Sequence, residues 1–314
     1  MGLTYAHRMF RLCTAAARAA QVSTAAALCA VAALTPALAD TGKLLLTGGV
    51  GSIDGAAGGG LSPWALVGTN ATEGQWGVSA HLSTVQSRDY GLNIAALTLA
   101  WDDRIELSLA RQDFDTRATG TALGLPGLHL RQDIVAAKWR VAGDAVLDSD
   151  RWMPQIAFGV EAKLLDAGAL GATLTALGAR RKGVDVYLSA TKLLLPQAVL
   201  VNATLRATRA NQNGLLGFGS TGHSQHRLLP EISVAWLLCR QLAVGAEWRA
   251  KPDNLNPSAL GAGLKEDDWR DIFVAWAPNK QWSLTAAWVD LGRIVPAVQP
   301  HAQRAAYLSL QWTH

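Results

Sequence analysis

Apolar and polar residues alternate along many stretches of this chain, each about ten residues long, which is the length of a tilted membrane-spanning strand. In residues 281–288, one side of an extended chain would carry Trp282, Leu284, Ala286 and Trp288. The other side would carry small or polar residues, and this period of two predicts a strand with one apolar face. Residues 269–277 have a similar length, and residues 278–280 are suited to the turn between the two stretches. The pair predicts an antiparallel hairpin.

The same kind of stretch recurs along the chain from residue 75 onward. Twelve strands are expected, at residues 75–84, 90–101, 104–114, 129–141, 152–164, 184–193, 198–210, 228–238, 241–251, 269–277, 281–290 and 305–313. Two further candidates, residues 42–47 and 64–69, would raise the count to fourteen. Both counts are even, as closure of a bacterial outer-membrane barrel usually requires.

The connections between these strands alternate in length. Short turns are expected at residues 102–103, 194–197, 239–240 and 278–280, with 142–151 a longer member of the same set. Long loops are expected at residues 115–128, 165–183, 211–227, 252–268 and 291–304, with 85–89 a brief member. Short turns at one rim and long loops at the other are typical of outer-membrane barrels. The fold class is therefore predicted as all-β, a transmembrane up-and-down antiparallel β-barrel of the outer-membrane type with 12–14 strands.

The two faces of the expected strands differ in charge. Facing the lumen we expect Arg104, Glu106, Glu161, Lys163, Arg206, Glu231, Glu247 and Arg249. A basic residue facing lipid costs roughly 2–4 kcal/mol at the bilayer midplane, so these residues cannot all face lipid. Facing the lipid or in the aromatic girdle we expect Trp248, Trp282, Leu284, Trp288 and Trp312. The inner charges either pair across strands and fill the barrel or line a narrow pore, because twelve to fourteen strands lie between filled and open barrels.

Residues 1–39 have the features of a cleaved export signal. Arg8, Arg11 and Arg18 form a basic region, residues 25–34 are apolar, and residues 37–39 read Ala-Leu-Ala before Asp40. The apolar run is too short for a membrane anchor. Residues 40–314 contain no linker or block of charge that would divide them, so a single barrel domain is expected there. The expected location is the bacterial outer membrane.

Composition excludes several classes of partner and site. Segment 1–39 holds three of the 28 basic residues and none of the 24 acidic ones, which leaves a net formal charge of +1. Such a balance gives no reason to expect nucleic acid as a partner. Two of the three cysteines also lie in that segment, so Cys239 alone can form neither an intramolecular disulfide nor a multi-cysteine metal site.

A glycine-rich stretch precedes the twelve strands. Residues 48–60 read GGVGSIDGAAGGG and run into residues 61–64, Leu-Ser-Pro-Trp. The stretch lacks the Gly-Lys-Ser/Thr ending of a phosphate-binding P-loop and the glycine spacing of a dinucleotide-binding turn. Glycine here is expected to give backbone freedom or close approach, so residues 48–63 are expected to form a loop or a plug in a crowded lumen.

Five segments of the chain resemble segments of the bacterial outer-membrane-barrel family catalogued as domain of unknown function 3034. The longest is KLLLTGGVGSIDGAAGGGLSPW at residues 43–64, and the others lie at residues 104–116, 141–155, 208–219 and 251–255. The resemblance covers essentially all of residues 40–314. It implies an outer-membrane-type barrel with no established activity and no known catalytic residues. The chain departs from the usual aromatic ending of such barrels, because His314 is last and Trp312 lies two places earlier.

No catalytic, cofactor-binding or metal-binding constellation is recognisable. Residues 189–192 match the S-x-x-K pattern of penicillin-binding enzymes, but they lie in an expected strand and lack its partner motifs. His223 and His226 would need a third ligand from another loop to hold a metal, and they are expected to be solvated. Residues 266–268 lack the EF-hand spacing and are also expected to be solvated. A protein without enzymatic activity, cofactor or metal is expected, with a lipid-acting outer-membrane enzyme as the weakest alternative.

The leading hypothesis is a porin-like channel or binding barrel for small solutes, and the main alternative is a structural envelope barrel with a plugged lumen. The expected partners are outer-membrane lipid, the barrel-assembly machinery and a small hydrophobic or polar solute.

The long loops are unusually apolar at residues 164–179, 215–219 and 260–264, and apolar loops need a partner in water. They are expected either to cover the lumen mouth as a lid or to extend the barrel wall. A sharper hypothesis follows, in which a hydrophobic small molecule enters there and residues 48–60 form a mobile plug beneath it.

Overall fold

The computed structural model of this chain describes residue 43 and residues 45–146, 152–259 and 261–314. The expected export signal, residues 1–39, lies outside the described residues. Within the described part of the chain, no helix is long and apolar enough to cross a membrane.

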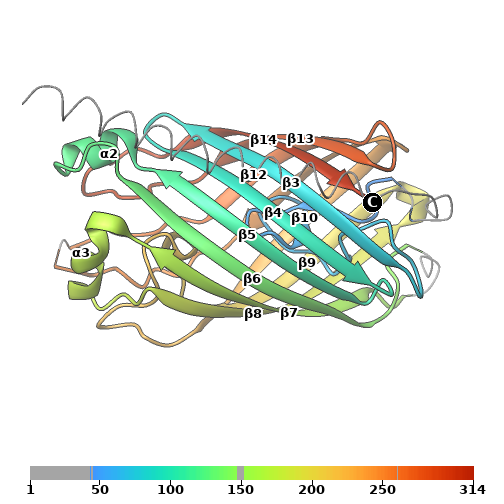
Figure 1. The fold of residues 1–314 in the computed structure, drawn as a ribbon, viewed down its shortest axis with the longest axis horizontal. Helices are drawn as coiled ribbons and strands as arrows, with labels where there is room; N and C mark the ends of the chain where they lie inside the picture. The colour runs from blue at the N-terminus through green and yellow to red at the C-terminus, as the bar shows by residue number, and fades with distance from the viewer. Residues whose placement is uncertain (1–42, 44, 147–151, 260) are drawn as a thin grey trace, which may run out of the picture. The chain divides into compact units, whose positions relative to one another are not determined.

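Twelve strands form one closed antiparallel barrel (Figure 1). Each strand pairs with the next one along the chain, and the last closes the ring on the first, with Leu310 opposite Leu82. The strands are β3 (Trp76–Ser87), β4 (Gly91–Trp101), β5 (Ile105–Asp115), β6 (His129–Ala142), β7 (Gln155–Asp166), β8 (Lys182–Leu194), β9 (Val199–Thr208), β10 (Arg227–Cys239), β11 (Leu242–Arg249), β12 (Trp269–Trp276), β13 (Trp282–Asp290) and β14 (Arg304–Thr313). The predicted fold class is confirmed, with twelve strands, the lower of the two predicted counts.

The connections are sorted by length between the two rims, as predicted. The loops at one rim contain α2 (Arg117–Ala122), η1 (Gly168–Leu170), α3 (Gly171–Ala176) and η3 (Asn211–Gly214), and α2 and α3 lie at the same end in Figure 1. The opposite rim has tight connections such as η2 (Leu195–Gln197). We call these two ends the long-loop rim and the short-turn rim.

The two additional strands of the fourteen-strand count are not present, so that count is wrong. Residues 45–48 form turns, and residues 65–69 have no strand structure. Among the described residues before β3, the paired strands are limited to a small hairpin, formed by β1 (Val50–Gly51) and β2 (Ala57–Gly58). The physical reason is that these backbone groups bond to side chains of the barrel wall instead of to a neighbouring strand. For example, the Ala65 amide donates to Thr191 Oγ1 at 2.8 Å.

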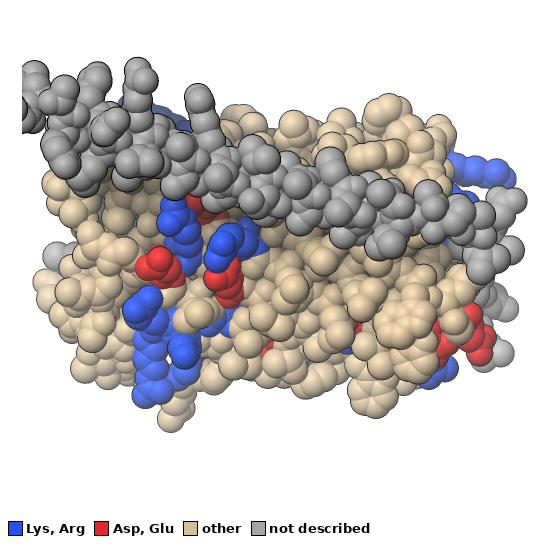
Figure 2. All heavy atoms as spheres, viewed as in Figure 1, with Lys and Arg blue, Asp and Glu red and all other residues tan. Residues whose placement is uncertain are grey.

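The outer surface of the barrel is largely apolar. The first three outward positions of β5 are Ile105, Leu107 and Leu109, all exposed, and Trp282 and Trp288 on β13 are 45% and 55% exposed. Trp248, Leu284 and Trp312 share the outward parity and are partly exposed. Charged side chains gather toward the ends of the face shown in Figure 2, with a mostly uncharged surface between them. An apolar band with tryptophans near its edges is the exterior of an outer-membrane-type barrel.

Arginine scanning of two adjacent positions on β13 tests this assignment of faces. Leu284 points outward, whereas Thr285 is 2% exposed and points into the lumen. Leu284→Arg should cost roughly 1–4 kcal/mol of folding free energy in lipid vesicles, depending on depth, because it places a charge in hydrocarbon. Thr285→Arg should cost clearly less. Equal losses would show that the register is wrong by one residue, since such a shift exchanges the two faces.

Candidate functional site

The segment before β3 fills part of the lumen, and we call residues 45–69 the plug. Every residue from 50 to 69 is buried. Both ends of the plug lie at the short-turn rim, where Lys43 pairs with Asp103 and the Asn70 side chain donates to the Lys280 carbonyl at 2.7 Å. The plug is therefore a loop inserted into the barrel from that rim.

Side chains of the barrel wall bind the backbone of the plug. Glu106 on β5 accepts from the amides of Ala57 at 3.0 Å and Gly68 at 2.8 Å. Lys138 on β6 donates to the carbonyls of Ala57, Trp64 and Leu66 at 2.7–3.2 Å. Such bonds satisfy backbone groups that would otherwise be buried without a partner.

The glycines of the plug allow this close approach. A Cβ atom built on Gly59 would lie 2.4 Å from Glu247 Oε1, and one on Gly58 would lie 2.0 Å from the Ser62 carbonyl oxygen. The contact with backbone requires glycine at position 58, whereas a side chain at position 59 would displace the Glu247 carboxyl group that holds the plug.

The tip of the plug is fixed by a network of buried charges. Asp54, which is fully buried, lies 3.1 Å from Lys163 Nζ, 3.0 Å from Arg249 Nη1 and 3.8 Å from Arg206 Nη2. The three cations also contact wall carboxylates, namely Glu161, Asp185 and Glu231. Asp54 is thus the one acid of the network that the plug contributes.

The structure places the eight residues expected in the lumen at two kinds of position. Seven are buried inside the barrel, namely Glu106, Glu161, Lys163, Arg206, Glu231, Glu247 and Arg249. Arg104 differs, because it lies in the turn before β5 with a 59% exposed side chain near Asp102. The expectation for Arg104 is therefore wrong, and the reason is that β5 begins one residue later than predicted.

Four buried charges that face the lumen were not predicted from the sequence: Asp54, Lys138, Asp185 and Asp271. Asp54 is the only charged residue between Lys43 and Glu73, and this isolation in a glycine-rich run was an available signal. Lys138 and Asp185 carry no such signal beyond their inward parity on β6 and β8.

The long loops converge into one apolar cluster, which we call the lid. Its members come from six loops and adjoining strand ends: Tyr90, Phe114, Leu128, Leu130, Leu165, Ala167, Leu174, Ala179, Ala210, Leu215, Leu216, Phe218, Leu255, Leu264 and Ile294. Loops that start around the ring can meet only above the lumen mouth. The alternative that residues 164–179 extend the wall fails, because β7 ends at Asp166 and η1 and α3 follow.

One loop of the lid reaches down to the plug. Asn213 in η3 donates to Asp54 Oδ1 at 2.7 Å and accepts from Lys163 and Arg249 at 3.0 and 2.8 Å. The backbone amide of the neighbouring Gln212 donates to Glu266 Oε2 at 2.9 Å. A displacement of η3 would therefore break bonds to the plug tip.

Residues 266–268 are not all solvated, so that expectation is wrong. Glu266 is buried beside Lys251, at 3.5 Å, because the loop after β11 is packed into the lid through Leu255 and Leu264. Burial raises the pKa of Glu266 to about 7, although Lys251 and the Gln212 amide oppose the shift. Asp267 forms an ion pair with Arg293, which helps to hold its pKa below the ordinary value.

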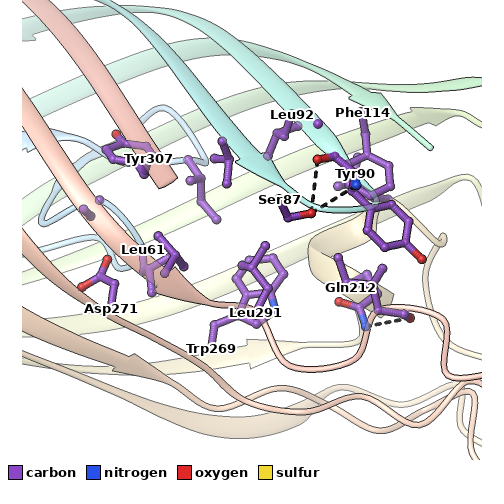
Figure 3. A pocket seen from close by; sticks show the side chains of 18 of the residues that line it. Leu61, Ser87, Tyr90, Leu92, Phe114, Gln212, Trp269, Asp271, Leu291 and Tyr307 are labelled. Atoms are coloured by element: carbon purple, nitrogen blue, oxygen red, sulfur yellow. Dashed lines mark hydrogen bonds between the residues drawn. The ribbon is translucent and has the colours of Figure 1, made fainter. Parts of the chain in front are cut away.

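An apolar pocket lies between the lid and the plug (Figure 3). It encloses about 780 Å³ of space, part of it open to solvent. The plug contributes Ile53, Gly59, Gly60 and Leu61 to its lining. The wall and lid contribute mainly Val85, Leu92, Phe114, Leu215, Leu216, Trp269, Ala287, Val289, Leu291, Ile294 and Tyr307. This pocket is the part of the molecule best suited to bind a small ligand.

The other residues considered for chemistry lie apart from the pocket. Ser189 Oγ hydrogen-bonds to the Pro63 carbonyl at 3.2 Å and to Thr204 Oγ1 at 2.7 Å, so it helps to hold the plug. His223 and His226 are exposed and lie near the carbonyls of Asn254 and Val184. Among the described residues, no group of three or more His, Cys, Asp or Glu could hold a metal ion.

Comparisons with known proteins give a family and several structures with low similarity. The family model with the description "Protein of unknown function (DUF3034)" matches residues 47–311. A search of curated proteins gave no match. A KdgM porin is 9% identical with a TM-score of 0.46 over 74% of this chain and 98% of that chain.

Two further solved structures are similar at a comparable level. Outer membrane phospholipase A from Escherichia coli is 7% identical, with a TM-score of 0.42 over 74% of this chain and 92% of that one. The Acinetobacter baumannii outer membrane protein Omp33 is 9% identical, with a TM-score of 0.39 over 77% and 99%. Values this low carry no argument about function, so the strand pairing and the exterior of this chain carry the fold assignment.

Proposed function

Because the chain belongs to the DUF3034 family, whose description states no function, we propose a function from the geometry of its lumen: the protein is a porin-like outer-membrane barrel that takes up small apolar solutes from the outer side. The apolar pocket between the lid and the plug carries this proposal. Lumen positions of a water-filled pore are polar, whereas this part of the lumen is lined by Leu, Ile, Val and aromatic residues.

The lid supports entry from the long-loop rim. Its apolar residues face one another, so a hydrophobic solute can replace contacts within the lid without exposing new apolar surface to water. Passage to the other side requires movement of the plug. The bonds between Asn213 and Asp54 offer a route by which a displaced η3 would loosen the plug tip.

Filling the pocket from β13 tests the proposal. Ala287 lines the pocket, and its neighbour Ala286 points outward. Ala287→Trp should lower the affinity for 1-methylnaphthalene more than about tenfold, because the indole occupies the space that the ring system would fill. Ala286→Trp is the matched control and should bind like the unchanged protein, since tryptophan is tolerated at the lipid surface. Equilibrium dialysis in one detergent measures all three proteins.

The outcome also separates this function from the structural alternative. Complete burial of residues 50–69 is what a permanently closed envelope barrel would show as well. If the unchanged protein binds no apolar probe, or if both tryptophan variants bind equally, the uptake function fails and the plugged structural barrel remains.

The proposal includes the location of the protein in the cell. Residues 1–39 act as a cleaved export signal, after which the barrel-assembly machinery inserts residues 40–314 into outer-membrane lipid. The apolar exterior and the sequence of residues 1–39 support this. Mass spectrometry of the protein from the outer-membrane fraction should give a chain that starts at Asp40, whereas a retained segment 1–39 would contradict it.

A further inference from the structure

Among the residues that line the pocket, Asp271 differs in chemistry from nearly all the others. It lies on β12, is 8% exposed, and belongs to the lining beside Leu61, Trp269 and Tyr307. Figure 3 shows its carboxyl group at one end of the pocket. Its Oδ1 atom has no hydrogen-bond partner among the described residues. A buried carboxyl oxygen without a partner costs free energy, which a bound ligand with a donor group would recover.

The neighbours of Asp271 do not supply a positive charge. Across the sheet, Asp271 lies opposite Glu247 on β11 and Val289 on β13. Among the described residues no ion pair is formed by Asp271 or Glu247. Arg249 pairs with Asp54 and Glu231, and Lys251 pairs with Glu266. The nearby cations are therefore already neutralised by other acids.

Glu247 differs from Asp271 in having its own partners. Its two carboxyl oxygens accept from the Leu61 amide and from Ser233 Oγ, both at 2.7 Å. Glu247 thus holds the plug, while Asp271 faces the pocket. Two carboxyl groups on adjacent strands favour a cation and disfavour an anion in the space before them.

The rest of the pocket suits the apolar part of such a ligand. Leu61, Val289, Leu291 and Ile294 provide aliphatic surface, and the rings of Trp269 and Tyr307 line the same space. Lys251 Nζ already lies 3.9 Å from the centroid of the Trp269 ring, so Tyr307 is the aromatic surface left for an ammonium group beside the carboxyl group of Asp271. Gln212 Oε1, on the lid side of the pocket, is a second buried acceptor without a partner among the described residues.

We propose that the pocket binds apolar amines, with Asp271 as the residue that receives the ammonium group and the aliphatic and aromatic lining as the site of the hydrocarbon body. This inference rests on the proposed uptake of apolar solutes and specifies the chemical class. A neutral hydrocarbon of the same shape binds more weakly, and a carboxylate binds worst, because the pocket presents uncompensated acceptors.

Four naphthalenes of one shape test the inference: 1-naphthylmethylamine, 1-naphthalenemethanol, 1-methylnaphthalene and 1-naphthoate. The unchanged full-length protein in detergent should bind the amine about 10-fold to 100-fold more tightly than 1-methylnaphthalene, the range expected for a charge-assisted hydrogen bond. Asp271→Asn should remove that preference and leave the affinity for 1-methylnaphthalene unchanged. Asp133→Asn, the same change at an exposed carboxylate on β6, should leave all four affinities unchanged.

The outcomes separate this inference from the function on which it rests. Equal affinity for the amine and 1-methylnaphthalene, tightest binding of 1-naphthoate, or an amine preference that survives in Asp271→Asn would overturn the role of Asp271 while leaving an apolar pocket. Binding of none of the four probes would overturn both. The ranking in the unchanged protein decides the ligand class even if Asp271→Asn fails to fold.

Discussion

A barrel that lacks the plug is expected to conduct ions, whereas the full-length protein should stay closed. The plug can be removed without moving the ends of the remaining chain far apart. A Cβ atom on Gly48 would lie only 3.3 Å from the Thr69 carbonyl oxygen and 3.8 Å from that of Val67. Deleting residues 50–67 therefore allows a direct connection from Gly49 to Gly68. Without the plug, the charged side chains that face the lumen would be exposed to water inside the twelve-stranded barrel.

Single-channel recording in planar bilayers measures this effect. The deletion variant should give resolved current steps that are proportional to voltage, and the full-length protein should give none. A variant that lacks residues 221–225, which are exposed in a long loop, is the control for loss of chain and should also be silent. A folded deletion variant that stays silent would show that the plug is not the sole barrier and that the lid also closes the lumen. Equal steps from the full-length protein would show that the plug does not close the lumen.

Replacement of Asp54 by Ala is expected to destabilise the folded barrel by about 3–5 kcal/mol, which is the usual cost of breaking a buried ion pair from one side. Lys163, Arg206 and Arg249 would each lose a contact with the plug in a region without water access. Asp133→Ala is the control, because its ion pair with Arg111 at 2.7 Å is exposed on both sides. That change should cost below about 1 kcal/mol.

Urea unfolding in lipid vesicles gives both free energies. A double variant, Asp54→Ala with Arg249→Met, should lose less than the sum of the two single variants, because the two residues contact each other and their effects are coupled. Equal costs at Asp54 and Asp133, or full additivity, would mean that the network does not hold the plug tip.

Much of the wall could be predicted because lipid and lumen give the two faces of each strand different chemistry. The hairpin expected at residues 269–277 and 281–290 is present as β12 and β13, with ends that differ by at most one residue. Arg104 shows the limit of that reasoning. A charged residue at a strand end fits a turn as well as a lumen, and alternation does not distinguish them.

The plug and the pocket depend on contacts between distant parts of the chain, so the sequence contains less information about them. Residues 64–69 are apolar enough for a strand, but their backbone amides donate hydrogen bonds to side chains of the wall. These side chains come close only in the assembled barrel. Asp271 looks like one more inward charge of β12. Its cross-strand partners on β11 and β13 are Glu247 and Val289, and neither is a cation. This arrangement follows from the register of three strands. The apolar loops did predict a need for a partner, and that partner is the other loops of the lid.

The position of a bound apolar solute tests the account most directly. Crystals of the full-length protein soaked with 1-bromonaphthalene allow the bromine to be located by its anomalous scattering. A bromine peak is expected inside the barrel, in the pocket bounded by Leu61, Val289 and Ile294, and no such peak is expected in crystals of Ala287→Trp. A peak found only against the outward leucines and tryptophans of the barrel, with the pocket empty of bromine, would contradict it.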